Sequence, residues 1–417
     1  MRDNWVKKKI REIGKVQTGS TPKTSDNDNF GDYIPFIKPS DFLKNGSLNY
    51  SNQGLSEFGL NKARVVDKHS VLMVCIGATI GKVGFTEKEV TTNQQTNSLT
   101  PLHGDCAKFL FYQMLTQDFQ RKVLNSSGQA TLPIINKTKW SNLSLYLPLL
   151  PEQKRIVAIL DEAFEAIDRA IANTEKNLAN SREVFESYLN AIFTQKGEGW
   201  LEKKLENICS IKHGFAFKGE FFTAEKSDYI LLTPGSFYES GGYRDQGDKT
   251  KYYIGEIPDG FILEKGDFLF AMTEQAVGLL GSSLIVPESD NKFLHNQRLG
   301  LVQVIDGFEW YNDFFFHQFN TQRFRSAVQS SASGVKVRHT SPKKLGAILV
   351  YFPRTIAEQK VCADTLNELY AETQRLETIY RQKLAALKEL KQSILQKAFT
   401  GELTADTPKT VKEEIAA

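Results

Sequence analysis

The chain has 417 residues, of which 24% are charged and 41% are hydrophobic, and its mean hydropathy is −0.35. These values are typical of a globular protein with room for at least two cores, and no run approaches the eighteen apolar residues of a membrane span. The net charge of +3 leaves the partners open, because a nucleic-acid-binding protein can gather its cations on one face.

The N-terminal stretch MRDNWVKKKIREIG is basic, but no apolar stretch follows it. We therefore expect neither a signal peptide nor a membrane anchor, and we expect the protein in the cytoplasm. The cysteines lie far apart and form no C-x-x-C pair, which favours reduced structural thiols over a zinc site or a redox dithiol. They are Cys75, Cys106, Cys209 and Cys362.

The first 150 residues predict mixed α and β structure with short strands. Ser70–Ile76 is a continuous apolar run, Gly77–Gly81 is a turn, and Lys82–Phe85 resumes the strand pattern, so we expect a buried β-hairpin. Phe109–Leu124 predicts one helix.

A much longer helix is predicted from Glu152 onward, because apolar or small residues recur at alternating steps of three and four without a proline. At 1.5 Å per residue it would span about 60 Å. Such a seam requires a partner helix; the alternative is an amphipathic helix that packs on its own domain. The expected seam residues are Ile156, Leu160, Ala163, Ile167, Ala170, Thr174, Leu178, Ser181, Phe185, Tyr188 and Ile192.

The second half of the chain predicts the same elements in the same order. Asp267–Val286 predicts a hairpin with its turn at Thr273–Gly278, and Trp310–Val328 predicts a helix. A second long helix follows Glu358. Its expected seam residues are Leu366, Leu369, Thr373, Leu376, Tyr380, Leu384, Leu387, Leu390 and Ile394.

Matching landmarks indicate that the two halves arose by duplication. The separation between matched residues starts at 195 and grows to 206, as expected if the second copy carries loop insertions such as Glu239–Lys251. The matched pairs are Trp5 with Trp200, Gly19 with Gly214, Leu72 with Leu269, Gly81 with Gly278, Asn93 with Asn296, Ser127 with Ser333, Glu152 with Glu358 and Phe193 with Phe399.

These observations predict an α+β protein with two pseudo-symmetric mixed α/β globular domains, separated by two long helices that form an antiparallel coiled coil. The expected divisions are a first globular domain over 1–150, a first helix over 151–196, a second globular domain over 197–355, a second helix over 356–400 and a C-terminal tail over 401–417.

Catalytic motifs were sought without success. Gly77–Lys82 has one residue too few for a phosphate-binding loop and lacks a Ser or Thr after the lysine, so a hairpin tip explains it better. Asp259, Glu264 and Lys265 lack the spacing of a nuclease site, and the six histidines show no metal-ligand spacing. We predict no catalytic residues and no metal ligands, which favours binding over catalysis.

The turn before each long helix has the chemistry of DNA contact, since Lys and Arg neutralise phosphates and Arg, Asn and Gln address base edges. A solvated polar loop is the alternative for each residue. Hairpin tips and early loops add further candidates. The DNA-binding candidates are Lys23, Lys38, Thr79, Lys82, Gln129, Thr131, Asn136 and Lys137 in the first copy, and Lys218, Gln275, Lys336, Arg338 and His339 in the second.

With these features the chain resembles the specificity subunit of Type I restriction-modification systems over nearly its whole length. The resemblance rests on Gly19–Pro22, Ile34–Lys38, the Gly77–Lys82 hairpin, the two Asn-Gln pairs and the Glu-Gln-Lys entries to the long helices. The second copy departs from it at His213-Gly-Phe-Ala and at Ala357, which suggests that the two globular domains differ in what they recognise.

The resemblance implies a non-catalytic subunit whose two target recognition domains bind a bipartite, asymmetric sequence in double-stranded DNA. It implies two modification subunits, which use S-adenosylmethionine to methylate adenine, and ATP- and Mg-dependent restriction subunits, while this chain binds no cofactor. Two other hypotheses are a coiled-coil adaptor without a DNA role and a nuclease or methyltransferase in its own right.

Overall fold

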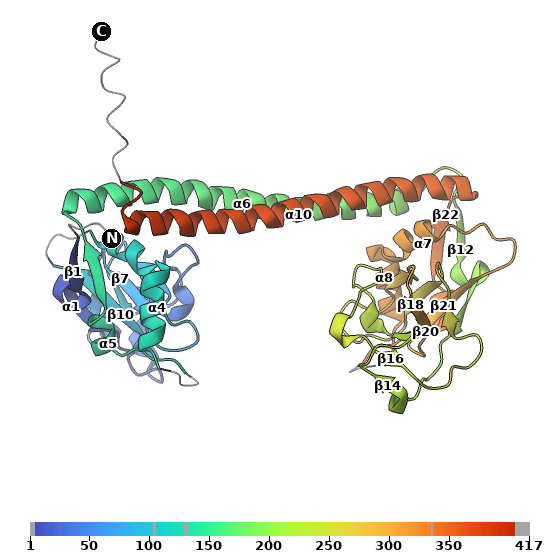
Figure 1. Cartoon of the computed structure of the whole chain (residues 1–417), viewed down its shortest axis with the longest axis horizontal. Helices are drawn as coiled ribbons and strands as arrows, with labels where there is room; N and C mark the ends of the chain where they lie inside the picture. Colours follow the sequence, from blue (N-terminus) through green and yellow to red (C-terminus); the bar gives the residue numbers. More distant parts are fainter. Residues whose placement is uncertain (1–4, 103–105, 129–131, 335–336, 405–417) are drawn as a thin grey trace, which may run out of the picture. The chain divides into compact units, whose positions relative to one another are not determined.

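The computed structural model describes residues 5–102, 106–128, 132–334 and 337–404 (Figure 1). The chain forms two compact units. Unit one comprises Met1–Lys176 together with Arg381–Ala417, and unit two comprises Asn177–Tyr380. Each long helix therefore contributes one half to each unit.

Unit one is built on a four-stranded antiparallel sheet in the order β2-β10-β7-β8. The central strand β7 is buried at every residue, which agrees with its uninterrupted apolar sequence VLMV. Strand β1 pairs with β11, and a smaller sheet has the order β4-β9-β6. The bounds are β1 Val6–Lys9, β2 Gly14–Thr18, β4 Phe36–Ile37, β6 Val65–Val66, β7 Val71–Val74, β8 Val83–Phe85, β9 Val90–Thr92, β10 Thr96–Pro101 and β11 Ser144–Leu147, with β3 Phe30–Gly31 paired to β5 Gly54–Leu55.

Unit two repeats this plan with the sheet β13-β21-β18-β19 and the strand pair β12-β22. Its additional sheet is larger, with the order β14-β16-β15-β20-β17. Both copies include one parallel pair, β4 with β9 and β15 with β20. The bounds are β12 Leu201–Lys204, β13 Cys209–His213, β14 Phe222–Thr223, β15 Tyr229–Leu232, β16 Tyr252–Tyr253, β17 Ile262–Leu263, β18 Phe268–Ala271, β19 Ser283–Ile285, β20 Lys292–His295, β21 Leu299–Val304 and β22 Leu349–Phe352.

The helix predicted over Phe109–Leu124 is wrong as a single element, because the structure has α3 Ala107–Met114 and α4 Gln117–Ser126. The hydroxyl of Thr116 accepts a hydrogen bond from the Phe119 N–H and starts α4 as its N-cap. The second copy breaks in the same way into α7 Asn312–Phe319 and α8 Gln322–Ser331, with Thr321 as the cap. The shorter helices are α1 Ile10–Ile13, α2 Glu57–Leu60, α5 Lys137–Ser141 and α9 Pro342–Gly346.

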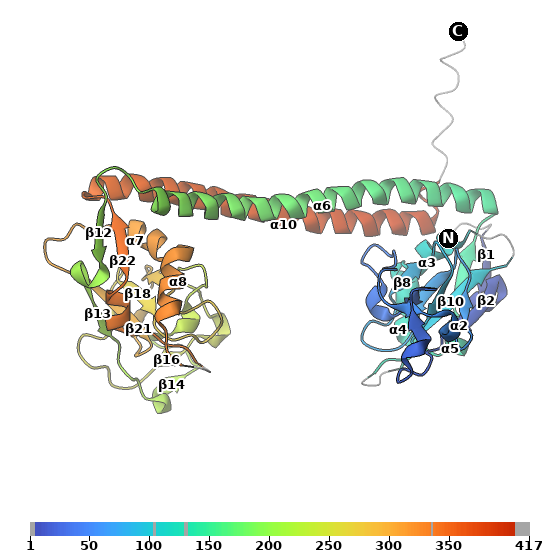
Figure 2. The ribbon, with the colours of Figure 1, turned by 180° about the vertical axis from the view of Figure 1, so that it is seen from behind.

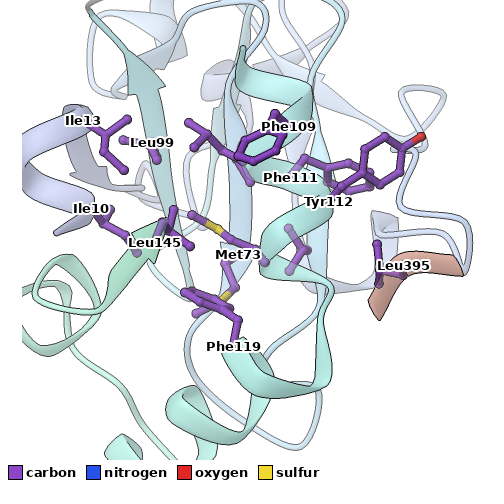
Figure 3. Packing of buried hydrophobic residues seen from close by; sticks show 14 of the residues in the cluster. Ile10, Ile13, Met73, Leu99, Phe109, Phe111, Tyr112, Phe119, Leu145 and Leu395 are labelled. Carbon is purple, nitrogen blue, oxygen red and sulfur yellow. The ribbon is translucent and has the colours of Figure 1, made fainter. Parts of the chain in front are cut away.

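Each unit has its own hydrophobic core. In unit one, aromatic residues of α3 and α4 pack on Met73 and Leu99 of the sheet and on Leu395 of the last long helix (Figure 3). In unit two, Phe314, Phe315 and Phe319 lie against the equivalent sheet, and all three side chains are fully buried. The globular part and the helix halves of each unit therefore share one core.

The long helices are α6 Leu150–Gln195 and α10 Ile356–Thr400, and they lie side by side in both views (Figures 1 and 2). In unit one, Asp168 of α6 pairs with Lys391 of α10 at 2.7 Å, and in unit two Arg182 pairs with Glu377 at 2.8 Å. Position numbers rise on one helix as they fall on the other, so the helices are antiparallel. The predicted antiparallel coiled coil is confirmed.

The predicted seam is correct at most positions but wrong at Tyr188 and Leu390, whose side chains are exposed. Near its C-terminus each helix packs on a globular part as well as on the other helix, so the buried face moves to Leu189 and Phe193 in α6 and to residues beyond Leu390 in α10. The seam threonines satisfy their hydroxyls within the helix, as Thr174 does by donating to the Ala170 carbonyl at 2.7 Å.

The repeated Glu-Gln-Lys start has a structural cause in its glutamine. Gln359 is fully buried; its Oε1 accepts from the Tyr311 N–H at 2.9 Å, and its Nε2 donates to the Glu309 carbonyl at 3.0 Å. In the first copy, Gln153 accepts from the Cys106 N–H at 2.9 Å. The same side chain thus fixes the start of each long helix to the globular part that precedes it.

All four cysteines are free of disulfide bonds. Over the residues that the structure describes, no helix combines the length and the apolar character needed to cross a bilayer.

Candidate nucleic-acid interface

In the first copy, four chain segments lie side by side where strands of the main sheet end. The Ser20 N–H donates to the Thr92 carbonyl at 2.9 Å, Cys75 donates to Gln95 at 2.7 Å, and Gly77 donates to Pro133 at 3.0 Å. These backbone bonds join the early loop, the Asn-Gln turn, the hairpin tip and the loop before α5. We call residues 19–21, 75–82, 93–95 and 132–137 strip one.

The second copy builds the same surface with the same bonds. The Phe215 N–H donates to the His295 carbonyl, Met272 donates to Arg298, and Glu274 donates to Arg338, each at 2.9 Å. We call residues 214–217, 272–281, 296–298 and 337–341 strip two. The loops that the sequence identified separately therefore form one continuous surface in each unit.

The repeated Asn-Gln pair explains part of this geometry. The side-chain oxygen of Asn93 accepts from the Gln95 N–H at 3.2 Å, and that of Asn296 accepts from the Arg298 N–H at 2.9 Å. Such Asx turns reverse the chain before the next strand. The asparagines are thus used structurally, while the neighbouring Gln94 is exposed.

The first-copy candidates lie on or beside strip one. Thr79 and Lys82 are exposed on the hairpin tip, and Lys137 is exposed at the start of α5. Asn136 is the N-cap of α5, and its Oδ1 accepts from the Lys139 N–H at 2.8 Å. That oxygen is therefore committed, which leaves the amide N–H groups of Asn136 for any ligand.

Two further first-copy candidates come from earlier loops. Lys38 is exposed directly after β4, where the Ile37 carbonyl accepts from the Asn93 N–H at 3.2 Å, so Lys38 adjoins strip one. Lys23 is also exposed and follows Ser20 in the same loop. Gln129 and Thr131 lie outside the described residues.

In the second copy, Gln275 and His339 are exposed on strip two. Arg338 is only half exposed: its guanidinium donates to the Gln329 carbonyl, and its Nε lies 4.0 Å from the Glu274 carboxylate. Lys218 is 73% exposed and follows strip two, with its Nζ 4.0 Å from Glu220. Lys336 lies outside the described residues.

The two hairpin tips differ in length, which corrects the pairing of Gly81 with Gly278. The Gly81 N–H donates to Val74 at 2.9 Å, and the equivalent bond in the second copy runs from the Gly281 N–H to Ala271 at 2.8 Å. Gly281 is therefore the counterpart of Gly81, and the second tip is longer. Both glycines have positive φ, 88° and 76°, which favours glycine at this turn.

Four strip residues were not predicted as contacts, although part of the Asn-Gln repeat was visible in the sequence. They are Gln94 and Gln95 in strip one, and Gln297 and Arg298 in strip two. The available signal was a polar turn between two apolar strands at the same place in both copies.

Two titratable side chains at the base of the strips are buried, and burial keeps both of them neutral at pH 7. Burial raises the pKa of Cys75 to about 12, so its thiol stays protonated and is a poor nucleophile. Burial lowers the pKa of His295 to about 4, and its Nε2 lies 3.0 Å from the Leu299 carbonyl, as expected for a neutral ring that donates there. Among the residues with described positions, no three His, Cys, Asp or Glu side chains gather as metal ligands.

The sequence matches the family model described as Type I restriction modification DNA specificity domain over residues 2–179 and again over 197–386. It is 28% identical over 240 residues to the Type I restriction enzyme EcoBI specificity subunit of Escherichia coli, covering 57% of this chain and 46% of that one. It is 26% identical to the MjaIX specificity subunit of Methanocaldococcus jannaschii, covering 51% and 53%. The chain thus spans about half the length of these two curated relatives.

The match to the MjaVIII specificity subunit of M. jannaschii extends over almost the whole of both chains, at 21% identity over 96% of this chain and 93% of that one. Solved structures share the fold. A chain from the study of complex assembly and conformational transition of the type I R-M system has a TM-score of 0.77 at 15% identity, covering 97% of this chain and 99% of that one. The HsdS subunit from Thermoanaerobacter tengcongensis has a TM-score of 0.59 at 15% identity, covering 97% and 98%.

Proposed function

Because this chain belongs to the Type I restriction-modification DNA specificity family, we propose that it is the sequence-reading subunit of such a system. Strip one reads one half of a bipartite, asymmetric site in double-stranded DNA, and strip two reads the other half.

The observation that carries this proposal is that the two strips share a backbone but differ in their exposed side chains. The same three backbone hydrogen bonds join the segments of each strip. Strip one exposes Thr79 and Lys82, and strip two exposes Gln275, Arg298 and His339. Gln and Arg can address base edges with two hydrogen bonds, and Lys neutralises phosphate. One scaffold with two sets of side chains suits two different half-sites.

The two long helices set the spacing between the half-sites and dock two modification subunits. This chain is not catalytic and holds no cofactor. Its partners supply S-adenosylmethionine-dependent adenine methylation, which requires the base to leave the helix, and the ATP- and Mg-dependent restriction subunits complete the complex. The complex works in the cytoplasm, where its DNA is.

The experiment is a genome-wide map of methylated adenines in cells with and without this chain. We expect methylation at one bipartite motif that disappears when the chain is deleted. Replacing residues 1–150 by those of another family member should change one half of the motif and leave the other half and the spacing intact. A swap that alters both halves, or neither, contradicts the proposal.

The alternative of a coiled-coil adaptor predicts that strip side chains are dispensable. Alanine at Lys82 and Gln275, which are both exposed, should then leave the methylation motif unchanged. Under our proposal these two substitutions weaken methylation at the motif, so the same map separates the hypotheses.

A further inference from the structure

The longer tip of the second hairpin has a matching change in the helix beside it. In strip one the tip runs from Gly77 to Gly81, and in strip two it runs from Glu274 to Gly281, with three more residues between the same two hydrogen-bonded positions. The three additional residues bring additional backbone groups that need hydrogen-bond partners.

In both copies the hairpin tip is supported by a side chain at the same position of the equivalent helix, α4 or α8. Gln120 of α4 donates from its Nε2 to the Gly81 carbonyl at 2.9 Å. Arg325 of α8 follows its cap Thr321 as Gln120 follows Thr116, and its guanidinium donates to the Gly278 carbonyl, inside the longer tip. The longer side chain, arginine in place of glutamine, thus contacts the longer tip.

Arg325 is also placed for electrostatic compensation. Its side chain is buried, and its second amino group donates to Asn320 Oδ1 at 3.2 Å. Glu274 at the start of the tip accepts from the Gly278 N–H at 3.2 Å and is only 14% exposed. A carboxylate in a DNA-facing loop repels phosphates unless cations lie close to it. The Glu274 carboxylate already has Arg338 Nε at 4.0 Å, and Arg325 adds a second, buried positive charge to this group.

The charge on Arg325 persists at neutral pH. Burial lowers the pKa of its guanidinium to about 10, and the carboxylates of Glu239 and Glu274 oppose this effect. The Arg325 side chain therefore carries a buried positive charge under a tip that holds a partly buried negative one.

We propose that Arg325 is a positioning residue for DNA reading by strip two. It holds the Gly278 carbonyl and, together with Arg338, offsets the charge of Glu274, so that the tip can approach the DNA with Gln275 exposed. This inference rests on the proposed function. It gives one buried side chain, that of Arg325, the role of supporting the longer tip of strip two.

The test uses the full chain expressed together with the modification subunits of its system. The DNA probes are duplexes that carry the mapped motif with either half scrambled. Arg325→Gln installs the residue that the first copy uses at this position. We expect it to weaken binding that depends on the second half by about tenfold, as for the loss of a hydrogen bond from a charged donor, with no change for the first half. Glu274→Gln in the same chain should recover part of the loss.

Arg323→Gln is the matched control, because Arg323 lies in the same helix but is exposed and donates to the Tyr351 hydroxyl at 2.6 Å. It should leave both halves unchanged. If R325Q does not fold, the double variant E274Q/R325Q is compared with the single variant E274Q, and the double variant should bind the second half more weakly. The inference is overturned if R325Q binds the second half as well as the wild type does. It is also overturned if the double variant binds it as well as E274Q does. If the wild-type complex itself ignores both scrambled halves, the proposed function fails instead.

Discussion

Arg182 of α6 donates two hydrogen bonds, of 2.8 and 2.9 Å, to the carboxylate of Glu377 on α10, and that carboxylate side chain is only 7% exposed. A second ion pair between the helices joins Asp168 to Lys391. The two pairs are equally far apart along both helices, from 168 to 182 on α6 and from 377 to 391 on α10. One register therefore holds in both units, and charged residues take part in specifying it.

Removing the arginine of this pair should destabilise unit two. We expect Arg182→Ala to lower the free energy of unfolding by about 1–2 kcal/mol, because two charge-assisted hydrogen bonds to a buried carboxylate are lost. Arg169→Ala is the control, since Arg169 and Glu165 form a pair within one helix and both side chains are about 70% exposed. That change should cost less than about 0.5 kcal/mol. Urea unfolding measures both, and equal effects would mean that the Arg182 pair is no stronger than a surface contact.

The buried glutamine at the start of α10 gives a second prediction. Gln359→Ala leaves the Tyr311 N–H and the Glu309 carbonyl without their side-chain partner, so we expect a loss of about 1–3 kcal/mol. Lys360→Ala changes the exposed neighbouring residue and should stay within about 0.5 kcal/mol. Thermal unfolding monitored by circular dichroism compares the two variants. If Q359A and K360A unfold at the same temperature, the glutamine does not fix the start of the helix.

The sequence predicted both hairpins and both long helices because these features depend on periodicity, which is local. It predicted the duplication because matched residues recur in the same order in both halves. It predicted Phe109–Leu124 as one helix because the apolar spacing continues across Thr116, and only the capping hydrogen bond shows that a new helix begins there. The seam failed at Tyr188 because α6 there packs on a globular part as well as on α10, and pattern alone cannot tell which surface a helix meets.

The interface was predictable in part. Composition identified its loops, but the strips arise from backbone hydrogen bonds between segments that are far apart in sequence, such as Gly77 with Pro133. The chemistry of Asn136 and Arg338 predicts DNA contacts, and the structure shows both engaged within the protein, as a helix cap and as a partner of Gln329. A residue type indicates what a side chain can bind, whereas its intramolecular partners decide how much of that capacity remains.

Stability should depend on pH through His295, which is fully buried in β20. Burial lowers its pKa from 6.5 to about 4, so between these values the unfolded chain binds a proton that the folded chain does not. The contribution of His295 to the free energy of unfolding should therefore be constant above about pH 6.5 and fall by about 3 kcal/mol as the pH drops to 4. Burial also lowers the pKa of His317, which acts in the same direction.

The His295 contribution can be isolated with His295→Thr, since the first copy has Thr92 at the equivalent position in β9. Urea unfolding of this variant at pH 7.5, 6 and 5 should show a weaker dependence on pH than that of the wild type, whatever its absolute stability. His339→Thr, which changes an exposed ring, should retain the wild-type dependence. An unchanged dependence in H295T would show that other groups control the acid sensitivity.

Lys82 offers the last prediction, on DNA affinity and salt. It is exposed on the tip of the first hairpin, just before β8, and its ammonium group can neutralise one phosphate. We expect Lys82→Ala to weaken binding to specific and nonspecific duplexes alike and to reduce the slope of log affinity against log salt by about one.

Lys88 is the control for Lys82, because it follows β8 at the opposite end of the same strand and lies 4.5 Å from the ring centre of Tyr50. Lys88→Ala should leave the slope unchanged. Fluorescence anisotropy over a series of salt concentrations gives both slopes. Equal slopes for K82A and K88A would remove the hairpin tip from the DNA-binding surface, because a phosphate contact necessarily appears in the salt dependence.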